Sequence, residues 1–310
     1  MSVLHNLPET KLKSETVVTI GVFDGIHLGH QSLLNRLITE ARVNGWRSVV
    51  LTFKSHPEII LNSGKQLPWL DDIANRVKRI EDLGIDLVVV IDFTPELRKL
   101  DAQDFVKLLK DRLNLRSLII GPDFAMGKDR QGNIETLGSL GKQMNFTVEA
   151  VPPFILNGEV VSSSLIRQVL AQGNMEKVTR LLGRYFSYSG QVTTGDRRGR
   201  TLGFPTANLT IKPGLASPPD GIYATITYLH DKAIPSVTNI GFRPTFDGKE
   251  RLIETHLINF SDNLLRKKLR IDFVDKLRDE KHFNSIEELK EQMGKDVELA
   301  KTRLTKLVKK

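Results

Sequence analysis

Two histidines three positions apart follow an apolar run near the N-terminus, an arrangement that suits phosphate chemistry. Residues 17 to 22, Val-Val-Thr-Ile-Gly-Val, are typical of a buried parallel strand, and a turn at Asp24-Gly25 ends it. His27 and His30 then begin a stretch whose apolar residues are spaced for one face of a helix. Backbone N–H groups and the positive dipole end of a helix favour anions, and imidazoles in the first turn add donors. The segment therefore predicts a phosphate site where a strand turns into a helix.

The same histidine spacing has two other interpretations. A histidine near a helix start is commonly a cap or a solvated side chain, and a pair on one turn also suits a metal ion. The preceding strand and glycine turn favour the phosphate interpretation, because they supply the context that the motif needs.

A serine-rich segment offers a second group of phosphate donors. Residues 161 to 167 read Val-Ser-Ser-Ser-Leu-Ile-Arg, with Ser163 and Ser164 at an expected helix start and Arg167 one turn later. Hydroxyls, free amides and a guanidinium are the donors that a polyphosphate needs. Taken alone, the segment fits a serine N-cap followed by a solvated arginine equally well.

A glycine-rich run is a second strong signal, at residues 190 to 208: Gly-Gln-Val-Thr-Thr-Gly-Asp-Arg-Arg-Gly-Arg-Thr-Leu-Gly-Phe-Pro-Thr-Ala-Asn. Glycines let a backbone approach phosphates closely, arginines add positive charge, and threonine and asparagine oxygens suit a hard cation such as Mg²⁺. The run matches neither the Walker A pattern nor the glycine loop of protein kinases. A tight turn explains a short glycine motif but explains the whole run poorly. The residues that we expect to bind phosphate or metal are Gly195, Gly199, Arg200, Gly203, Thr206 and Asn208.

The histidine segment resembles a known signature. Residues 21 to 30, Gly-Val-Phe-Asp-Gly-Ile-His-Leu-Gly-His, are similar to the HxGH nucleotidyltransferase signature in the FMN adenylyltransferase half of the bacterial bifunctional riboflavin kinase/FAD synthetase family. The serine segment resembles the same family's Ser-Ser-Thr-x-x-Arg element, with Ser164 in place of threonine. The resemblance implies in-line attack of an FMN phosphate oxygen on the α-phosphorus of ATP, with Mg²⁺ bridging phosphates. It implies charge-stabilising roles for His27, His30 and Arg167, and nucleotide contacts for Gly21, Phe23, Asp24, Gly25, Ser163 and Ser164.

Residues 121 to 132, Gly-Pro-Asp-Phe-Ala-Met-Gly-Lys-Asp-Arg-Gln-Gly, form a glycine-rich loop after an expected strand. Turn formation alone explains most loops of this composition. In the resemblance, the segment takes the place of the family's Gly-x-Asp-Phe-x-Phe-Gly loop, so Asp123 and Phe124 become candidates for the flavin site. Met126 stands where the family carries its second aromatic residue.

The run at 190 to 208 is similar to the riboflavin kinase signature that ends in Gly-Phe-Pro-Thr-Ala-Asn. The resemblance covers nearly the whole chain, because it continues through residues 219–223, 239–245, 254–257 and 277–280. It implies that Thr206 and Asn208 approach Mg²⁺ and that Glu254 takes the proton from the ribityl 5′-hydroxyl. Arg278 and Phe283 become flavin-site candidates.

Two observations qualify the kinase interpretation. Taken alone, Glu254 is one acid on a strand, for which an exposed ion pair is the ordinary role. The chain also departs from the family at Leu264-Leu265-Arg266, where Leu-Tyr-Gly is usual.

Strand-like and helix-like stretches alternate in the first half of the chain. Apolar runs predict strands at residues 17–22, 48–53, 87–93, 118–120 and 147–151. Helical periodicity occupies 33–41, 73–83 and 102–113, the last with Asp101 as its expected N-cap. Such alternation predicts a parallel sheet with helices on both faces and ligand sites at the carboxyl ends of the strands. In the resemblance this is the Rossmann-like α/β nucleotidyltransferase domain of HxGH type.

The pattern changes near Gly183. Two helices are expected before it, at 164–172 and 175–182, and strand-like segments separated by turn residues come after it, at 185–192, 221–229, 234–239, 252–258 and 269–273. Short strands at this density predict a small β-barrel. Ser285 and Glu288 form a capping box for a terminal helix with apolar positions through Leu307. The predicted domains are therefore residues 1–183 and 184–310.

The composition is that of an ordinary globular protein. The 310 residues suffice for about two domains, and 40% are hydrophobic and 26% charged. The net charge of +8 suits anionic ligands, nucleic acid or simply a solvated basic surface. The absence of cysteine excludes disulfides, thiolate chemistry and cysteine zinc sites. The sequence has no signal-peptide pattern or membrane-length apolar run, which predicts a soluble cytoplasmic protein.

These observations predict a bifunctional enzyme that uses ATP and Mg²⁺ to phosphorylate riboflavin in its C-terminal domain and to adenylylate FMN to FAD in its N-terminal domain. The alternative is an adenylyltransferase whose kinase domain is impaired by the change at 264 to 266. A flavin-responsive regulator or an RNA-binding module is a different class, and the low aromatic content of 6% argues against RNA. The expected partners are riboflavin, FMN and ATP, without nucleic acid or membrane, for a monomer or weak homo-oligomer.

Overall fold

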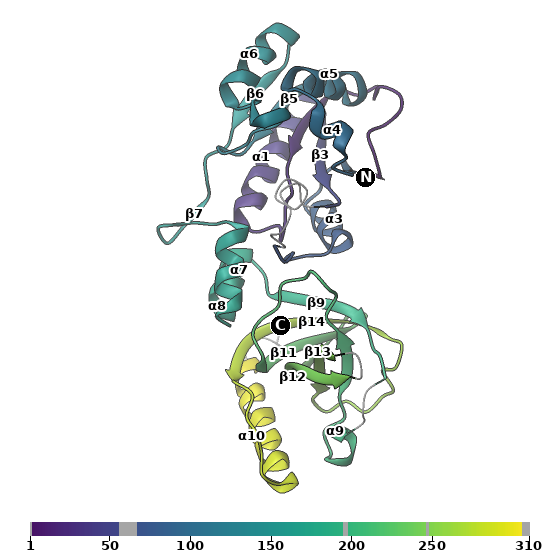
Figure 1. Cartoon of the computed structure of the whole chain (residues 1–310), viewed down its shortest axis with the longest axis vertical. Helices are drawn as coiled ribbons and strands as arrows, with labels where there is room; N and C mark the ends of the chain where they lie inside the picture. The colour runs from purple at the N-terminus through teal and green to yellow at the C-terminus, as the bar shows by residue number, and fades with distance from the viewer. Residues whose placement is uncertain (1, 56–66, 195–197, 246–247, 306–310) are drawn as a thin grey trace. The chain divides into compact units, whose positions relative to one another are not determined.

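The computed structural model describes residues 2–55, 67–194, 198–245 and 248–305. The chain divides into two compact units, Met1–Ser163 and Ser164–Lys310, which are described separately (Figure 1). Gly195 and Leu307, both named above, lie outside the described residues, and so does the side chain of Arg200.

The first unit is built on a parallel sheet with its described strands in the order β1-β4-β3-β2-β5-β6. Every neighbouring pair is parallel, which confirms the predicted α/β sheet. The edge strand β1 is absent from the sequence prediction, because three residues are too few for a readable pattern. The strands are β1 (Ser2–Leu4), β2 (Thr16–Ile20), β3 (Arg47–Phe53), β4 (Leu87–Ile91), β5 (Leu115–Ile120) and β6 (Thr147–Ala150), followed by a hairpin of β7 (Ile155–Leu156) and β8 (Glu159–Val160).

Helices connect these strands. Asp101 caps α5 as predicted, since its carboxylate accepts the Asp104 N–H at 2.8 Å. The sequence prediction misses α6, where Gly138 and Gly141 lower the helix propensity. Glycine is needed at 141, because a Cβ there would lie 2.6 Å from the Phe146 carbonyl oxygen. The helices are α1 (Leu28–Asn44), α3 (Ile73–Asp82), α4 (Pro95–Lys99), α5 (Ala102–Leu113) and α6 (Ile134–Met144), with a 3-10 turn at Lys128–Arg130.

Successive residues of each central strand enter different apolar layers. Val18 and Leu51 pack with residues of α5 and α6 on one face of the sheet. Val17 and Val50 pack with residues of α1 and α3 on the other face. The sheet is therefore buried on both faces. Its carboxyl edge, where open α/β sheets generally bind ligands, is where β2 leads into the turn that contains His27 and His30, called the histidine turn below.

The second unit contains two helices near their predicted bounds and a near-closed barrel of antiparallel strands, in the order β10-β13-β12-β11-β14-β9. A bridge between Thr193, just after β9, and Asn208 on β10 joins the two ends of that order. The elements are α7 (Ser163–Ala171), α8 (Met175–Leu182), β9 (Phe186–Gln191), α9 (Arg198–Thr201), β10 (Ala207–Thr210), β11 (Gly221–Leu229), β12 (Lys232–Thr245), β13 (Gly248–Leu257) and β14 (Lys268–Arg278).

The barrel interior carries a network of hydroxyl groups. Thr225, Thr227, Ser236, Thr238 and Thr255 are all fully buried. Their oxygens lie 2.7 to 2.9 Å apart along a chain that runs from Thr227 through Ser236, Thr225 and Thr238 to Thr255. Because each buried hydroxyl has a partner, the network avoids the penalty of unpaired polar groups.

The outer face of the barrel packs against the terminal helix α10 (Ile286–Leu304). Ala224 and Ile226 of β11 contact the cluster that contains Ala300 and Leu304 of the helix. The predicted cap is confirmed, since the Glu288 N–H donates to Ser285 Oγ at 3.1 Å. Helix α10 is therefore held against the outer face of the barrel.

Candidate active sites

The turn after β2 begins α1, as the sequence predicts. His27 is the N-cap of the helix, and its Nδ1 accepts the backbone N–H of His30 at 3.3 Å. The two imidazoles stack with ring centres 3.6 Å apart, and Phe23 lies edge-on to His30 with ring centres 5.3 Å apart. One histidine is therefore a helix cap and also a member of a stacked pair.

The loop between β2 and α1 has a strained backbone. Phe23, Gly25 and Ile26 have positive φ angles of 53°, 79° and 36°, a region that a β-branched residue rarely adopts. Phe23 and Ile26 are buried, so the apolar core holds the loop in this conformation. A Cβ at Gly21 would lie 3.0 Å from the Phe23 ring, which explains the glycine at the end of the strand.

Asp24 fixes the same loop from within the protein. Its buried carboxylate accepts the backbone N–H groups of Leu70 at 3.0 Å and of Asp71 at 3.2 Å. A Cβ at Gly25 would lie 2.8 Å from Leu70 Cδ1, so glycine permits this packing. The contacts described here give Asp24 and Gly25 a role in shaping the predicted nucleotide site.

The serine segment reaches the histidine turn within the first unit. Ser163 Oγ donates to the Asp24 carbonyl oxygen at 2.9 Å, although the two residues are 139 positions apart. A Cβ at Gly29 would lie 3.1 Å from the Val161 carbonyl oxygen, so the glycine between the histidines allows the close approach. Ser164 and Arg167 follow on α7 and belong to the second unit.

His30 sits in surroundings that oppose its charged form. Burial, followed by the neighbouring His27 and Arg76, lowers the pKa of His30 well below 6.5. Its Nδ1 is buried and has no hydrogen-bond partner among the described residues. The imidazole is therefore neutral near pH 7, and its Nδ1 makes no hydrogen bond within the described ranges.

Arg76 is a site residue that the sequence prediction misses. Its buried guanidinium donates to the carbonyl oxygens of Val22 at 2.8 Å and Phe53 at 2.7 Å, at the ends of β2 and β3. Burial lowers its pKa to about 10, so the group stays charged at pH 7. A signal existed, because Arg76 falls between Ile73 and Ile80 on the apolar face of α3.

The loop at 121 to 132 presents its predicted residues differently. Asp123 is exposed, whereas Phe124 is half-buried against the apolar layer of α5 and α6. Met126 is buried in that layer and pairs with Gly132 in a backbone bridge. The residue in place of the family's second aromatic is therefore part of the core, and the flavin roles of Asp123 and Phe124 stay predictions.

A cavity of about 680 Å³ in the second unit brings most of the predicted kinase residues together. Gly199, Thr206, Glu254, Arg278 and Phe283 all line it. Gly203 and Asn208 are not among its lining residues. Gly203 lies in a turn, with φ of 91°, and Asn208 is buried on β10. The cavity walls also include residues that the prediction does not single out, namely Phe204, Ile222, Asn239, His256 and Glu280 with Leu289, Met293 and Asp296 of the terminal helix.

One row of paired residues crosses five strands beside this cavity. Glu254 on β13 pairs with Asn208 on β10 and with Asn239 on β12. The row continues from Asn239 to Ile222 on β11 and to Arg278 on β14. Residues directly opposite in a sheet project from the same face, so strand pairing places the predicted base next to two amides.

The segment between α9 and β10 is held against β13. A Cβ at Gly199 would overlap the Phe204 carbonyl oxygen, and the Phe204 N–H donates to the Gly199 carbonyl at 2.8 Å. His256, two residues after Glu254, lies with its Nδ1 2.9 Å from the Pro205 carbonyl oxygen. A carbonyl only accepts, so Nδ1 carries the proton and the imidazole anchors the segment that leads to Thr206.

Arg278 is fixed by the terminal helix. Its Nε lies 2.9 Å from Asp296 Oδ1, and its Nη2 lies 2.7 Å from Oδ2, a two-point ion pair with a buried carboxylate. Gln292 donates to the same carboxylate at 2.8 Å. The pair ties β14 to α10 across one wall of the cavity.

The departure at 264 to 266 affects a turn. Arg266 has φ of 61°, a left-handed conformation that suits the glycine usual in the family. The turn is nevertheless formed, because the Arg266 N–H donates to Val192 at 3.0 Å and the Lys267 N–H to Leu264 at 2.9 Å. Neither Leu265 nor Arg266 lines the cavity, so the change does not alter its walls.

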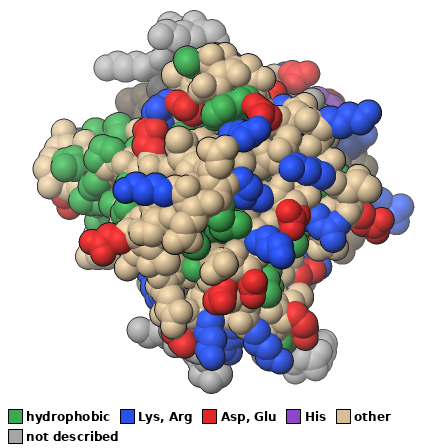
Figure 2. Space-filling model, turned by 90° about the horizontal axis from the view of Figure 1, so that it is seen from above, with side chains coloured by type: hydrophobic (Ala, Val, Ile, Leu, Met, Phe, Trp, Pro, Cys, Tyr) green, Lys and Arg blue, Asp and Glu red, His purple; other side chains and the backbone are tan. Residues whose placement is uncertain are grey.

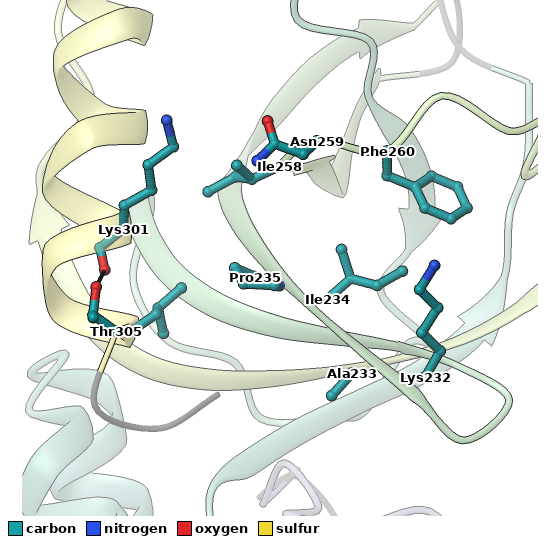
Figure 3. Close-up of a pocket in the computed structure, with 10 residues that line it drawn as sticks. Lys232, Ala233, Ile234, Pro235, Ile258, Asn259, Phe260, Lys301 and Thr305 are labelled. Carbon is teal, nitrogen blue, oxygen red and sulfur yellow. Dashed lines mark hydrogen bonds between the residues drawn. The ribbon is translucent and has the colours of Figure 1, made fainter. Parts of the chain in front are cut away.

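A smaller cavity of about 380 Å³ lies elsewhere in the second unit (Figure 3). Figure 3 shows Lys301 on one side of the cavity and Lys232 on the other, with the apolar side chains of Ile234, Pro235 and Ile258 between them. Its described lining includes no aspartate or glutamate and no residue of the predicted sites.

Surface charge, metal clusters and membrane spans bear on the class of protein. On the face drawn in Figure 2, lysine and arginine side chains are interspersed with aspartate and glutamate, as in the solvated basic surface considered above. The described residues contain no cluster of three or more His, Cys, Asp or Glu side chains suited to a metal. Among the helices of the described ranges, none is long and apolar enough to cross a membrane.

Comparisons with known proteins match each half of the chain. A family model described as FAD synthetase matches residues 9–165, and one described as riboflavin kinase matches residues 182–304. These matches and the two sites define an ATP-dependent transferase of flavins. The chain belongs to the bifunctional riboflavin kinase/FMN adenylyltransferase family, whose members convert riboflavin to FMN and FMN to FAD. It accordingly carries both activities, with riboflavin, FMN and ATP as substrates.

Similarity to individual relatives extends over nearly the full length. The bifunctional enzyme of Buchnera aphidicola subsp. Schizaphis graminum is 38% identical over 303 residues, which are 96% of each chain. That of Escherichia coli K12 is 34% identical over 94% of each chain. A crystal structure described as a macrolide-efflux protein from Streptococcus pneumoniae superposes with a TM-score of 0.89 at 29% identity, over 97% of this chain and 98% of the other. The full-length match confirms the predicted combination of an α/β domain and a small barrel.

Proposed function

We propose that riboflavin is phosphorylated in the 680 Å³ cavity, with Glu254 as the general base. The observation that carries this assignment is the row of paired residues, because it puts the carboxylate inside the cavity between two amides. A carboxylate so placed takes the proton from the ribityl 5′-hydroxyl as the γ-phosphate of ATP transfers. Gly199 contacts the phosphates together with Gly195 and Arg200, and Gly203 shapes the turn that follows. Arg278 and Phe283 form the flavin side of the cavity.

Thr206 and Asn208 hold Mg²⁺ in this proposal. The donor set fits the ion, since hydroxyl and amide oxygens are hard ligands, and Asn208 Oδ1 is buried without a hydrogen-bond partner among the described residues. When bound, Mg²⁺ neutralises phosphate charge during the transfer. The protein orients these oxygens through the His256 contact with the loop and through the pairing of β10 with β13.

FMN adenylylation takes place at the histidine turn. Gly21, Phe23, Asp24 and Gly25 shape the loop, and His27 and His30 stabilise charge on the phosphates together with Ser163, which contacts this loop. Ser164 and Arg167 keep the phosphate-binding roles that the resemblance implies. Although burial lowers the pKa of His30, its neutral imidazole still donates one N–H, which suits a hydrogen bond to a phosphate oxygen. Asp123 and Phe124 contact the flavin.

The adenylyltransferase domain spans residues 1–183 and the kinase domain residues 184–310. The FAD synthetase match ends at residue 165 and the riboflavin kinase match begins at residue 182, two residues before the proposed kinase domain. Contacts instead group α7 and α8 with the barrel. The enzyme works in the cytoplasm as a monomer or weak homo-oligomer, without a nucleic-acid or membrane partner.

The test is a pair of reciprocal variants in the full chain. With riboflavin, ATP and Mg²⁺, Glu254→Gln lowers FMN formation about 10²- to 10⁴-fold, because the base is lost. The same variant converts supplied FMN to FAD at the wild-type rate. His30→Ala does the reverse, with normal FMN formation and strongly reduced FAD formation. Chromatography of the flavins after each reaction gives both rates.

Glu280→Gln is the matched control, since Glu280 is a second carboxylate in the same cavity. It should reduce FMN formation far less than Glu254→Gln. Full kinase activity in Glu254→Gln would refute the assignment of the base, and a larger loss in Glu280→Gln would move that role to Glu280. Wild-type FAD formation in His30→Ala would remove the histidine from the adenylyl transfer.

A further inference from the structure

Asn239 occupies a distinctive place in the kinase cavity. It lies directly opposite Glu254 in the pairing of β12 with β13, and it lines the cavity. We infer that Asn239 Oδ1 is a further oxygen ligand of the metal ion that accompanies the nucleotide, beside Thr206 and Asn208. The inference rests on the proposed kinase site and extends its metal-binding set to a third strand.

Strand pairing supports the assignment. Glu254 has Asn208 on one side and Asn239 on the other, each as its direct cross-strand partner. Such partners have Cβ atoms about 4.5 to 5.5 Å apart on the same face, close enough for both amides to reach one ion. Thr238 and Thr255, the sequence neighbours of Asn239 and Glu254, face the barrel interior, and their hydroxyls are hydrogen-bonded to each other in its hydroxyl network.

The hydrogen bonding of the two amides supports it independently. The Oδ1 atoms of Asn208 and Asn239 are both buried, and neither has a hydrogen-bond partner among the described residues. Buried polar atoms are nearly always paired, so two unpaired oxygens on either side of one carboxylate indicate a missing ligand. Because both free atoms are acceptors, a cation fits them directly.

Charge explains why amides are suitable here. A carboxylate bound to Mg²⁺ would be a weaker base, since the ion stabilises its charged form. Two amide oxygens and a hydroxyl bind the ion without adding charge, and phosphate oxygens and water complete its octahedral shell. Glu254, which binds no metal in this arrangement, then keeps the basicity that it needs to accept the substrate proton.

A second role for the same residue is open to test. The Nδ2 group of Asn239 could instead donate to Glu254 and orient the base, in which case metal binding would not depend on it. Asn239→Asp separates the two roles, because aspartate keeps an oxygen at this position but has no N–H donor.

The experiment is an electron paramagnetic resonance titration of the full-length protein with Mn²⁺ in the presence of ADP. Thr206→Val identifies which bound Mn²⁺ belongs to the barrel, since the adenylyl site contributes its own. Asn239→Ala and Asn239→Ser should lower the affinity for that same Mn²⁺ ion about 10- to 100-fold. Asn239→Asp should bind it at least as tightly as the wild type. Asn259→Ala, which changes an asparagine in the smaller cavity, is the matched control and should leave the affinities for both Mn²⁺ ions unchanged.

The outcomes are distinguishable. If Thr206→Val lowers the affinity for the barrel Mn²⁺ ion and Asn239→Ala and Asn239→Ser do not, Asn239 is not a ligand. This inference then fails, while the proposed metal site at Thr206 stands. Loss of Mn²⁺ affinity in Asn239→Asp would also overturn it, because aspartate keeps an oxygen at this position, whereas unchanged affinity in all three Asn239 variants is the result that the orienting role predicts. If Thr206→Val changes neither ion, the proposed metal site itself fails. Tyrosine circular dichroism of each variant checks that the barrel is folded, and a variant that is unfolded is replaced by the other of the Ala and Ser pair.

Discussion

The ion pair between Arg278 and Asp296 should be a main support of the kinase unit. It joins β14 to α10 with contacts of 2.9 and 2.7 Å, and the side chains are 21% and 5% exposed. We expect that separating the pair destabilises the barrel and loosens the wall of the cavity. A double-mutant cycle measures this directly, because it isolates the energy of the pair from the other effects of each change.

The magnitude follows from the burial of each partner. Removing one partner of a buried pair costs about 3 to 5 kcal/mol, since the other charge stays buried without compensation. Arg278 retains some access to water, so Asp296→Ala should cost about 2 kcal/mol of unfolding free energy. Arg278→Met leaves the carboxylate with Gln292 alone and should cost about 3 kcal/mol. The double variant should cost about 2 kcal/mol, which corresponds to a coupling energy of about 3 kcal/mol.

The chain provides its own probes for this measurement. All four tyrosines, Tyr185, Tyr188, Tyr223 and Tyr228, lie in the second unit, and both tryptophans, Trp46 and Trp69, lie in the first. Urea unfolding followed by tyrosine circular dichroism therefore reports the barrel, whereas tryptophan fluorescence reports the α/β unit. Only the tyrosine transition should shift.

The pair between Lys295 and Glu291 is the matched control. It lies on the same helix with a contact of 2.6 Å, but its side chains are 65% and 68% exposed. Solvent screening should leave its coupling energy within experimental error. A coupling at the Arg278 pair no larger than that of the control would refute the argument from burial.

Two further predictions concern the histidine turn and the turn at 266. The folded chain resists protonation of His30 and the unfolded chain does not, so stability of the first unit should fall as the pH drops through 6.5. Tryptophan-monitored urea unfolding at about pH 7.5 and about pH 5.5 should give a smaller difference for His30→Gln than for the wild type, and an equal difference would contradict the burial of the imidazole. Arg266→Gly should stabilise the barrel by about 1 kcal/mol, because glycine adopts the left-handed conformation at no steric cost. A lower tyrosine transition midpoint, or altered FMN formation, would contradict this assignment of a turn role.

The regular elements with strong apolar patterns were predictable from the sequence. Buried runs such as 48–53 and 87–93 gave strands close to β3 and β4, and the Asp101 and Ser285 caps located the starts of α5 and α10. Elements without such patterns were not predictable. Strand β10 is four residues inside a glycine-rich run, and β14 continues to Arg278 past two irregularities in its pairing with β11.

The sites were predictable by residue type but not by register. Motif spacing identified Glu254, Thr206 and Asn208, while only the pairing of separate strands brings Asn239 beside them. For Arg76 the sequence indicates a charged residue on an apolar helix face, but it does not indicate which carbonyl groups the guanidinium contacts.

The hydroxyl-filled barrel has a thermodynamic consequence for the enzyme. Exposure of apolar surface raises the heat capacity of unfolding, and exposure of polar surface lowers it. The threonines and serine inside the barrel should therefore give the kinase half a smaller heat-capacity change per residue than the valine- and leucine-rich adenylyltransferase half. The stability curve of the kinase half is then flatter, so this half stays folded to a lower temperature than the adenylyltransferase half. On cooling, FAD formation, the second catalytic step, should therefore be lost before FMN formation, the first.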